Sequence, residues 1–463
     1  MITLSPASPR IPRAGPARAR PVLLASLVVL ALAGAPLAGG QAGQAGQPGQ
    51  PGAPDGPRRL VRAGRLIDGV GDGARVDQGI LIAGERIVRV GPYAEVAAAA
   101  GDAERIDLGR FTVLPGLIDA HTHVFLDGRP YAQQLLESSI PYRTIAATAA
   151  ARAALGYGFT TIRDLETEGA MYADVDIKSA IERGVIPGPR MFVATRALAP
   201  TGMYPLSGYS WELSVPAGAQ LVDGADNLRR AVREQVKFGA DWIKVYADRD
   251  TYVGDDGRLH SWPNWTDEEF QAIVTEAHRL GRSVAAHATG REGIDAALRA
   301  GVNSIEHGDG LTPDLMDRME RQRVYWSPTI YVGARPLAGR PPMRDIMAAH
   351  KRRAIGEAAR RAMAELIAFG TDAGGFAWSE NPAQEFAYLV RYGLTPMGAI
   401  RSATQTAARL LDRGEQLGSV AAGRYADLIA VAGDPLTDIT VLERVRWVMR
   451  GGQVARDDTR RTP

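Results

Sequence analysis

The sequence contains no cysteine, and this absence excludes disulfides, thiolate metal ligands, a thiol nucleophile and a cysteine-linked lipid anchor. Lysine is almost as rare, because Lys178, Lys237, Lys244 and Lys351 are the only four among 54 basic residues. The other 50 basic residues are arginine. A lysine within an apolar run of this chain is therefore a candidate for a specific role.

The composition is that of an ordinary soluble globular protein. Hydrophobic residues make up 45% and charged residues 23% of the 463 residues, which excludes a disordered or collagen-like chain. This length is enough for one large barrel or for two to three smaller domains. The formal charge of only +2 gives no support to a nucleic-acid partner.

The first 57 residues differ in composition from the rest of the chain. Four arginines precede a short apolar run, 22–33, which is followed by small residues, so residues 1–40 predict a secretory signal peptide. About 20 apolar residues are needed to span a bilayer, and no other run approaches that length. We therefore expect export to the periplasm or the medium, without stable membrane insertion after cleavage. Residues 41–57, rich in Gly, Gln and Pro, predict a low-complexity linker.

The remaining sequence predicts an α/β protein with two parts. Short Val, Ile and Leu runs punctuated by glycine occupy 58–113 and return in 413–455, which predicts a small composite β-sandwich domain built from both ends. Between them, in 114–412, eight apolar strand candidates alternate with amphipathic segments. This alternation predicts a (β/α)8 TIM barrel. A doubly wound open sheet is the alternative, but no glycine-rich phosphate turn follows the first strand.

Polar groups that can bind metal recur where the predicted barrel strands end. Alternation along a strand points residues i and i+2 to the same side, so the two histidines of LIDAHTHV converge. The carboxyl ends of barrel strands meet at one mouth, where active sites are built. The six candidate residues, from five strands, are His121, His123, Lys244, His287, His307 and Asp372. Imidazole and carboxylate ligands without thiolate fit zinc, with manganese, iron, cobalt and nickel left open.

Lys244 has two interpretations at this mouth. Desolvation between Ile243 and Val245 would favour its neutral amine, which can react with carbon dioxide to give a carbamate able to bridge two metals. Without that modification, the ammonium group would pair with an acid.

These motifs resemble the amidohydrolase superfamily in its binuclear, carboxylated-lysine form. The resemblance rests on VLPGLIDAHTHV, GFTTIRDL, GADWIKVYAD, VAAHATG, SIEHGD, AFGTDAG and LGSVAAGRYADLIAV, and it covers nearly the whole chain after residue 58. K-V-Y at the fourth strand and the predicted signal peptide are most similar to the Xaa-Pro dipeptidase and imidazolonepropionase-like branch. That branch includes metal-dependent carboxypeptidases and dipeptidases.

The resemblance implies two divalent metal ions and a mechanism. One ion would bind His121, His123 and Asp372, and the other His287 and His307, with carboxylated Lys244 between them. A bridging hydroxide would attack the scissile carbonyl of a small-molecule amide, such as a dipeptide or an N-acyl amino acid. Asp372 would transfer the proton to the leaving amine, and Tyr246 would stabilise the developing oxyanion. Relatives form homo-oligomers, so we expect one here.

Two points stay open at this stage. The chain has no third histidine shortly after HTH, and Arg129, Arg163 or an arginine from a loop would have to bind a substrate carboxylate instead. Alternative activities are opening of a cyclic amide or deamination on one metal, with Glu292 as a weakly matched proton shuttle. A barrel retained only for binding is a third alternative, which the complete ligand set disfavours.

Overall fold

The computed structural model describes residues 56–203, 206, 208–336 and 342–460. The predicted signal peptide and nearly all of the predicted linker fall outside these residues. In the part that is described, no helix combines the length and the apolar character needed to cross a membrane.

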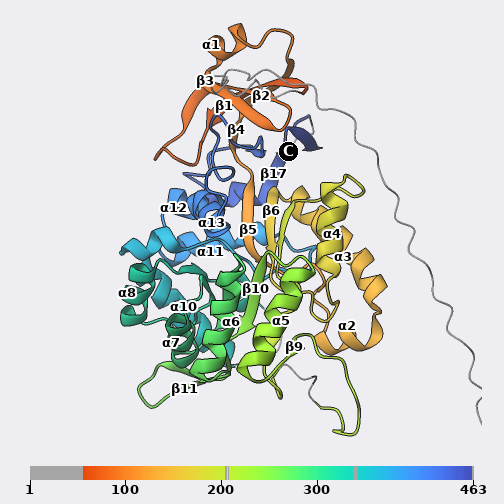
Figure 1. The fold of residues 1–463 in the computed structure, drawn as a ribbon. Coiled ribbons are helices and arrows are strands. Elements are labelled where there is room, and N and C mark those ends of the chain that lie inside the picture. Colours follow the sequence, from red (N-terminus) through yellow and green to blue (C-terminus); the bar gives the residue numbers. More distant parts are fainter. Residues whose placement is uncertain (1–55, 204–205, 207, 337–341, 461–463) are drawn as a thin grey trace, which may run out of the picture. The chain divides into compact units, whose positions relative to one another are not determined.

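Strands from both ends of the chain share one sheet of seven strands, in the order β18-β17-β16-β4-β1-β2-β3 (Figure 1). Their bounds are β1 Arg58–Leu66, β2 Arg75–Ala83, β3 Arg86–Pro92, β4 Glu104–Pro115, β16 Leu428–Val431, β17 Val445–Arg450 and β18 Gln453–Asp457. Strand β4 joins the two halves, since it pairs parallel to β1 and antiparallel to β16. Buried Val61, Ile80, Leu428 and Trp447 belong to a common apolar cluster of this sheet. The two-layer sandwich stays a prediction.

The middle of the chain contains parallel strands in two groups, β5-β6-β7 and β15-β14-β13-β10-β8-β9. Their bounds are β5 Leu117–Thr122, β6 Phe159–Asp164, β7 Arg190–Val193, β8 Leu198–Ala199, β9 Gln220–Leu221, β10 Trp242–Tyr246, β13 Ser283–Ala288, β14 Ser304–His307 and β15 Tyr325–Ser327. The N–H of Asp241, just before β10, donates to the carbonyl of Val193 at the end of β7 and links the two groups. Seven of the eight strands predicted in 114–412 are thus present, with somewhat different ends. They are β5, β6, β7, β10, β13, β14 and β15.

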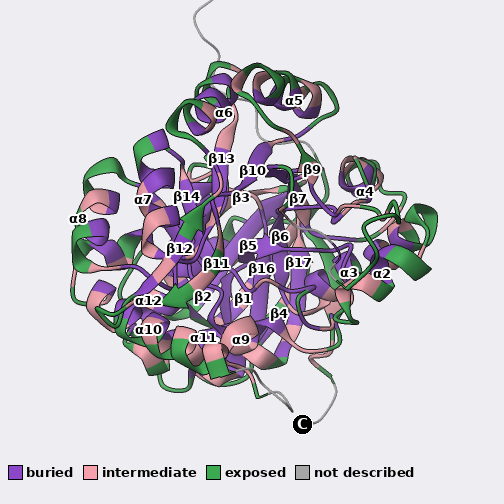
Figure 2. Ribbon diagram, turned by 90° about the horizontal axis from the view of Figure 1, so that it is seen from below, coloured by how far each residue is buried: buried purple, intermediate pink, exposed green. Residues whose placement is uncertain are grey.

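Helices lie around these strands, with their exposed faces outward and the buried strands in the middle (Figure 2). The main helices are α3 Ile140–Gly156, α4 Ala173–Glu182, α5 Ala225–Lys237, α6 Asp267–Arg279, α7 Arg291–Ala300, α8 Pro313–Gln322, α10 Pro342–Ala358, α11 Glu385–Tyr392 and α12 Pro396–Arg401. Further α-helices are α1 Tyr93–Ala98, α2 Tyr131–Glu137, α9 Ile330–Ala334 and α13 Ala407–Leu410. Strands β11 (Asp248–Val253) and β12 (Leu259–Pro263) form an antiparallel hairpin after β10.

The eighth predicted strand, AFGTDAG, is not a regular strand in the structure. Two isolated parallel bridges join this region to its neighbours, one from Ile367, the residue before the segment, to Trp326 and one from Ala373 to Thr122. The backbone leaves the extended region at Asp372, with φ of 61°, and at Gly374, with φ of 108°. A Cβ on Gly374 would lie 2.2 Å from the carbonyl oxygen of His123, so glycine permits this close approach. The segment therefore connects β15 with β5 without a continuous ladder.

Candidate metal centre

The structure brings the predicted metal ligands together at the carboxyl ends of the parallel strands. His121 and His123 come from β5 and the residue after it, and His287 and His307 lie in β13 and at the end of β14. Asp372 lies in the irregular segment that bridges to β5, next to the bridging residue Ala373. Parallel pairing of β10 with β13 places Lys244 opposite Ala285, two residues before His287.

Three donor atoms of the first predicted ligand set have the spacing that a tetrahedral ion requires. The Nε2 atoms of His121 and His123 are 3.3 Å apart. Oδ1 of Asp372 lies 3.6 Å from Nε2 of His121 and 3.2 Å from Nε2 of His123. Ligands about 2.1 Å from a tetrahedral zinc ion lie about 3.4 Å from one another. These residues therefore fit a metal ion with little rearrangement.

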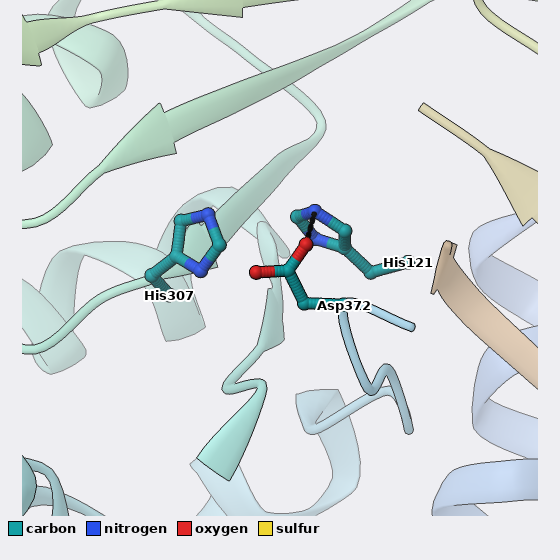
Figure 3. A group of neighbouring side chains, drawn as sticks. All are labelled: His121, His307 and Asp372. Atoms are coloured by element: carbon teal, nitrogen blue, oxygen red, sulfur yellow. Dashed lines mark ion pairs between the residues drawn. The ribbon is translucent and has the colours of Figure 1, made fainter. Parts of the chain in front are cut away.

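The Asp372 carboxylate also lies between His121 and His307 (Figure 3). One donor atom each from these three residues falls within 4.8 Å of the other two. Asp372 and His307 both have left-handed backbones, with φ of 61° and 70°. Non-glycine residues seldom adopt this conformation, which concentrates at functional sites. The left-handed residue His307 directly follows Glu306, and the side chains of both residues belong to the centre.

The second predicted set forms the wall of a cavity of about 190 Å³. The imidazole centroids of His287 and His307 are 4.6 Å apart, and Nδ1 of His307 is 2.8 Å from the hydroxyl of Thr329. Asp372 lines the same cavity. A small substrate that enters this cavity would therefore meet the second ligand set and Asp372 of the first.

Burial sets the charge of these groups. It lowers the pKa of His121 to about 4 and that of His287 to about 3, and nearby Lys244 acts in the same direction. Both imidazoles are therefore neutral at pH 7, which is the form that binds metal. Burial also lowers the pKa of His123, but the hydrogen bond and charge of Asp372 outweigh it and raise that pKa to about 9. A cation would take the place of the proton held between His123 and Asp372.

The environment of Lys244 fits a reactive amine. Its side chain is fully buried, and burial lowers its pKa against the attraction of Glu306, Glu166 and Asp372. A buried lysine with a lowered pKa is a better nucleophile toward carbon dioxide than a solvated one. The carbamate on Lys244 stays a prediction.

Sequence reasoning missed Glu306, which orients the first histidine. Its Oε2 is 2.9 Å from Nδ1 of His121, and its Oε1 accepts hydrogen bonds from Arg163 and Ser304. A carboxylate on Nδ1 fixes the imidazole tautomer and directs Nε2 toward the metal site. Burial raises the pKa of Glu306, but Arg163 and His121 outweigh it and lower that pKa to about 2. The only sequence signal was Glu306's place beside His307.

Replacing Arg163 by methionine should destabilise the metal-free protein by about 3–5 kcal/mol, because it leaves the fully buried Glu306 carboxylate without its cation. Urea unfolding would measure this loss. The double variant with Glu306→Gln should recover part of it, since no unpaired buried charge remains. If the unfolding free energy of Arg163→Met alone lay within about 1 kcal/mol of the wild-type value, the ion pair of Arg163 with Glu306 would not be important for stability.

Other acidic groups surround the centre. The hydroxyl of Tyr246 donates to Oε2 of Glu166 at 2.7 Å, and the ring of Tyr246 lies 5.0 Å from that of His287. Oε1 of Glu168 is 3.6 Å from Nδ1 of His123, and its Oε2 accepts a hydrogen bond from Tyr131. Neither glutamate was singled out from the sequence, because both lie in a loop after β6 and reach the site only through the fold.

The candidates for binding a substrate carboxylate are placed elsewhere than expected. Arg163 is buried and paired with Glu306, and Arg129 pairs with Asp127 beside it. Lys351, in helix α10, is buried and lines the cavity. Glu292 accepts hydrogen bonds from His260 and from the backbone of Ser261 in the β11–β12 hairpin. These contacts give Glu292 a structural role.

Comparison with known proteins identifies relatives along most of the chain. The model of the amidohydrolase family matches residues 112–455. Ochratoxinase from Aspergillus niger is 30% identical over 440 residues, which cover 85% of this chain and 86% of that protein. Imidazolonepropionase from Solibacter usitatus is 27% identical over 375 residues, covering 74% of this chain and 81% of that protein.

A solved Xaa-Pro dipeptidase with methionine bound in its active site has a similar structure. It is 34% identical, with a TM-score of 0.76, over 86% of this chain and 99% of that one. The fold is therefore of the TIM-barrel type, and the predicted branch is confirmed. The chain belongs to the amidohydrolase family and is a hydrolase of carbon–nitrogen bonds.

Proposed function

We propose that this protein is a metal-dependent amidohydrolase that cleaves an amide bond in dipeptides or N-acyl amino acids. The observation that carries the proposal is the convergence of the donor atoms of His121, His123 and Asp372 beside the small cavity. The similar dipeptidase that holds methionine supports an amino acid as one product.

The residues present fit two divalent ions, which we propose to be zinc. His121, His123 and Asp372 would hold one, His287 and His307 the other, and a carbamate on Lys244 would be shared. When bound, the ions supply an activated water and polarise the scissile carbonyl. We also propose that the parallel strands close into a (β/α)8 barrel, which the two bridges of the 367–373 segment support.

The chain's own residues would move the proton and hold the substrate. Asp372 lines the cavity and would accept a proton from the attacking water and then give it to the leaving amine. Tyr246 remains the proposed donor to the oxyanion. Because its hydroxyl donates to Glu166 in the structure, this role requires the hydroxyl to turn toward the substrate.

Ring opening of a cyclic amide is a second candidate, favoured by the similarity to an imidazolonepropionase over three quarters of the chain. The two candidates differ in the products. A linear substrate is cleaved into two molecules, whereas a cyclic amide gains one water and remains a single molecule.

To test the proposal, the mature protein would be loaded with zinc and incubated with mixed dipeptides, N-acyl amino acids and cyclic amides. Mass spectrometry would follow the products. We expect cleavage of linear amides, loss of activity after treatment with a chelator, and recovery when zinc is restored. Mass gain of one water on cyclic amides alone would favour the second candidate, and inactivity on all three classes would contradict both.

We further propose that the protein is exported and works as a homo-oligomer. The basic start, short apolar run and small residues of 1–40 support export. Fractionation of cells that produce the full chain would test it, together with the N-terminal sequence and light-scattering mass of the mature protein. A cytoplasmic or uncleaved product would contradict export, and a monomeric product would contradict the homo-oligomer.

A further inference from the structure

Helix α10 presents one face to the cavity at the metal centre. Arg344, Met347, Ala348 and Lys351 line this cavity together with the metal-ligand candidates His287, His307 and Asp372. Their spacing of three, four and seven residues places them on one side of a helix. The cavity therefore has predicted metal ligands in one part of its wall and a basic helix face in another.

Lys351 is the buried cation of this face. Its exposed fraction is 5%, and its Nζ lies 3.2 Å from Oδ1 of Asp309, which is equally buried and also lines the cavity. An ammonium group has three donors, and a single carboxylate contact uses only one. Asp309 thus fixes the position of the amine and leaves donors for a second acceptor.

The positive charge of Lys351 acts on residues of the metal centre. Its charge contributes to lowering the pKa of both His287 and His307. It also acts on Glu385, whose carboxylate accepts the N–H groups of Ile330 and Tyr331 at the start of α9. Because Lys351 lines the same cavity as His287, His307 and Asp372, a small substrate in that cavity can meet both the amine and these residues.

We propose that Lys351 binds the free α-carboxylate of the amino acid that leaves, so that the enzyme cleaves amides of amino acids with an unblocked carboxyl end. This inference rests on the proposed function. Asp372, which would protonate the leaving amine, lines the same cavity, and an α-carboxylate is separated from that amine by a single carbon. The cavity volume of about 190 Å³ suits one amino acid rather than a longer peptide.

The physical reason for selectivity is the cost of an unmatched buried charge. A carboxylate next to Lys351 forms a charge-assisted hydrogen bond, whereas a carboxamide or ester leaves the ammonium without that partner. Met347, Ala348 and Ile330 supply apolar contacts for the side chain of the leaving residue. The specificity would therefore be strict for the carboxylate and tolerant for the side chain.

The experiment compares N-acetyl amino acids with their C-terminal amides, using wild type and Lys351→Met. We expect the wild type to prefer the free acid by about 10- to 100-fold in kcat/KM. The variant should lose that factor on the acid and change less than about threefold on the amide. Equal cleavage of acid and amide by the wild type, or an equal loss on both in the variant, would overturn the proposal.

Two further variants control for folding. Lys351→Met with Asp309→Asn removes both charges, so it leaves no unpaired carboxylate and should show the same loss of preference. Lys178→Met breaks a partly exposed pair with Asp241 and should keep the preference. Arg344→Gln should also keep the preference for the free acid. If Arg344→Gln lost this preference and Lys351→Met kept it, the carboxylate would bind Arg344, and the proposal would be overturned.

A binding measurement separates this inference from the proposed function. Calorimetry on metal-free protein should show that wild type binds a free amino acid about 10-fold or more tightly than its amide, and that Lys351→Met binds both equally. If the zinc-loaded wild type cleaves neither substrate, the proposed function fails while this readout still decides the role of Lys351. Equal binding of acid and amide by the wild type would overturn that role.

Discussion

Replacing Lys244 by alanine is expected to lower kcat/KM by about 10³-fold or more, because the proposed carbamate and the placement of both proposed ions would be lost together. Metal analysis of the same sample should show fewer than two ions per chain. The side chain is buried and interacts with the charges of Glu306, Glu166 and Asp372, so alanine removes an interior group of the centre rather than a surface one. Steady-state kinetics on a substrate identified from the mixed library would measure the loss.

The scarcity of lysine supplies a clean control for this experiment. Lys178→Ala removes an amine whose Nζ is 2.7 Å from Asp241 in a partly exposed ion pair. It should leave both activity and metal content within about twofold of the wild type. If Lys244→Ala instead kept full activity and full metal content, the binuclear mechanism would be wrong.

The second large effect is expected for Asp372→Asn. An amide has nearly the same shape as the carboxylate but cannot carry the proton from water to the leaving amine, so kcat should fall by about 10²- to 10⁴-fold. Asp372 also contacts His121 and His123, so some loss of metal affinity should accompany the loss of activity. Kinetics at saturating zinc separates the two effects.

Asp314→Asn is the matched control, since the exposed Asp314 pairs with Arg291, which is not among the residues of the centre. It should change kcat by less than twofold. Activity of Asp372→Asn near that of the wild type would assign the proton transfer to another group, such as Glu166 or Glu168.

Much of the site was accessible from the sequence because it depends on local rules. Alternation along a strand predicts that His121 and His123 point the same way, and their Nε2 atoms are indeed 3.3 Å apart. The rule that parallel strands end at one edge predicts that His287 and His307 are neighbours, as their ring separation of 4.6 Å shows. The capping box of Thr266 and Glu269 at the start of α6 also follows a local rule, because its Thr-x-x-Glu pattern spans only four residues.

The features that were missed depend on contacts between distant segments. Glu306 and Arg163 are 143 residues apart and lie in strands of different sheets, β14 and β6, so nothing near either residue in the sequence indicates their buried ion pair. Lys351 lies in a helix rich in arginine, and only packing against the segment after β14 shows that it is buried beside Asp309. The irregular backbone at Asp372 breaks the strand that the apolar pattern predicts, because that residue must turn toward the histidines.

The sequence alone therefore determined the alternation of strands and helices, the ligand types and the family resemblance, since these follow from short-range periodicity and motif chemistry. Tertiary structure alone decided which carboxylate orients His121, which cation reaches the cavity and how the eighth predicted strand meets β5. The physical reason is that burial and long-range pairing set the charge and position of a side chain, and neither is encoded in its near neighbours.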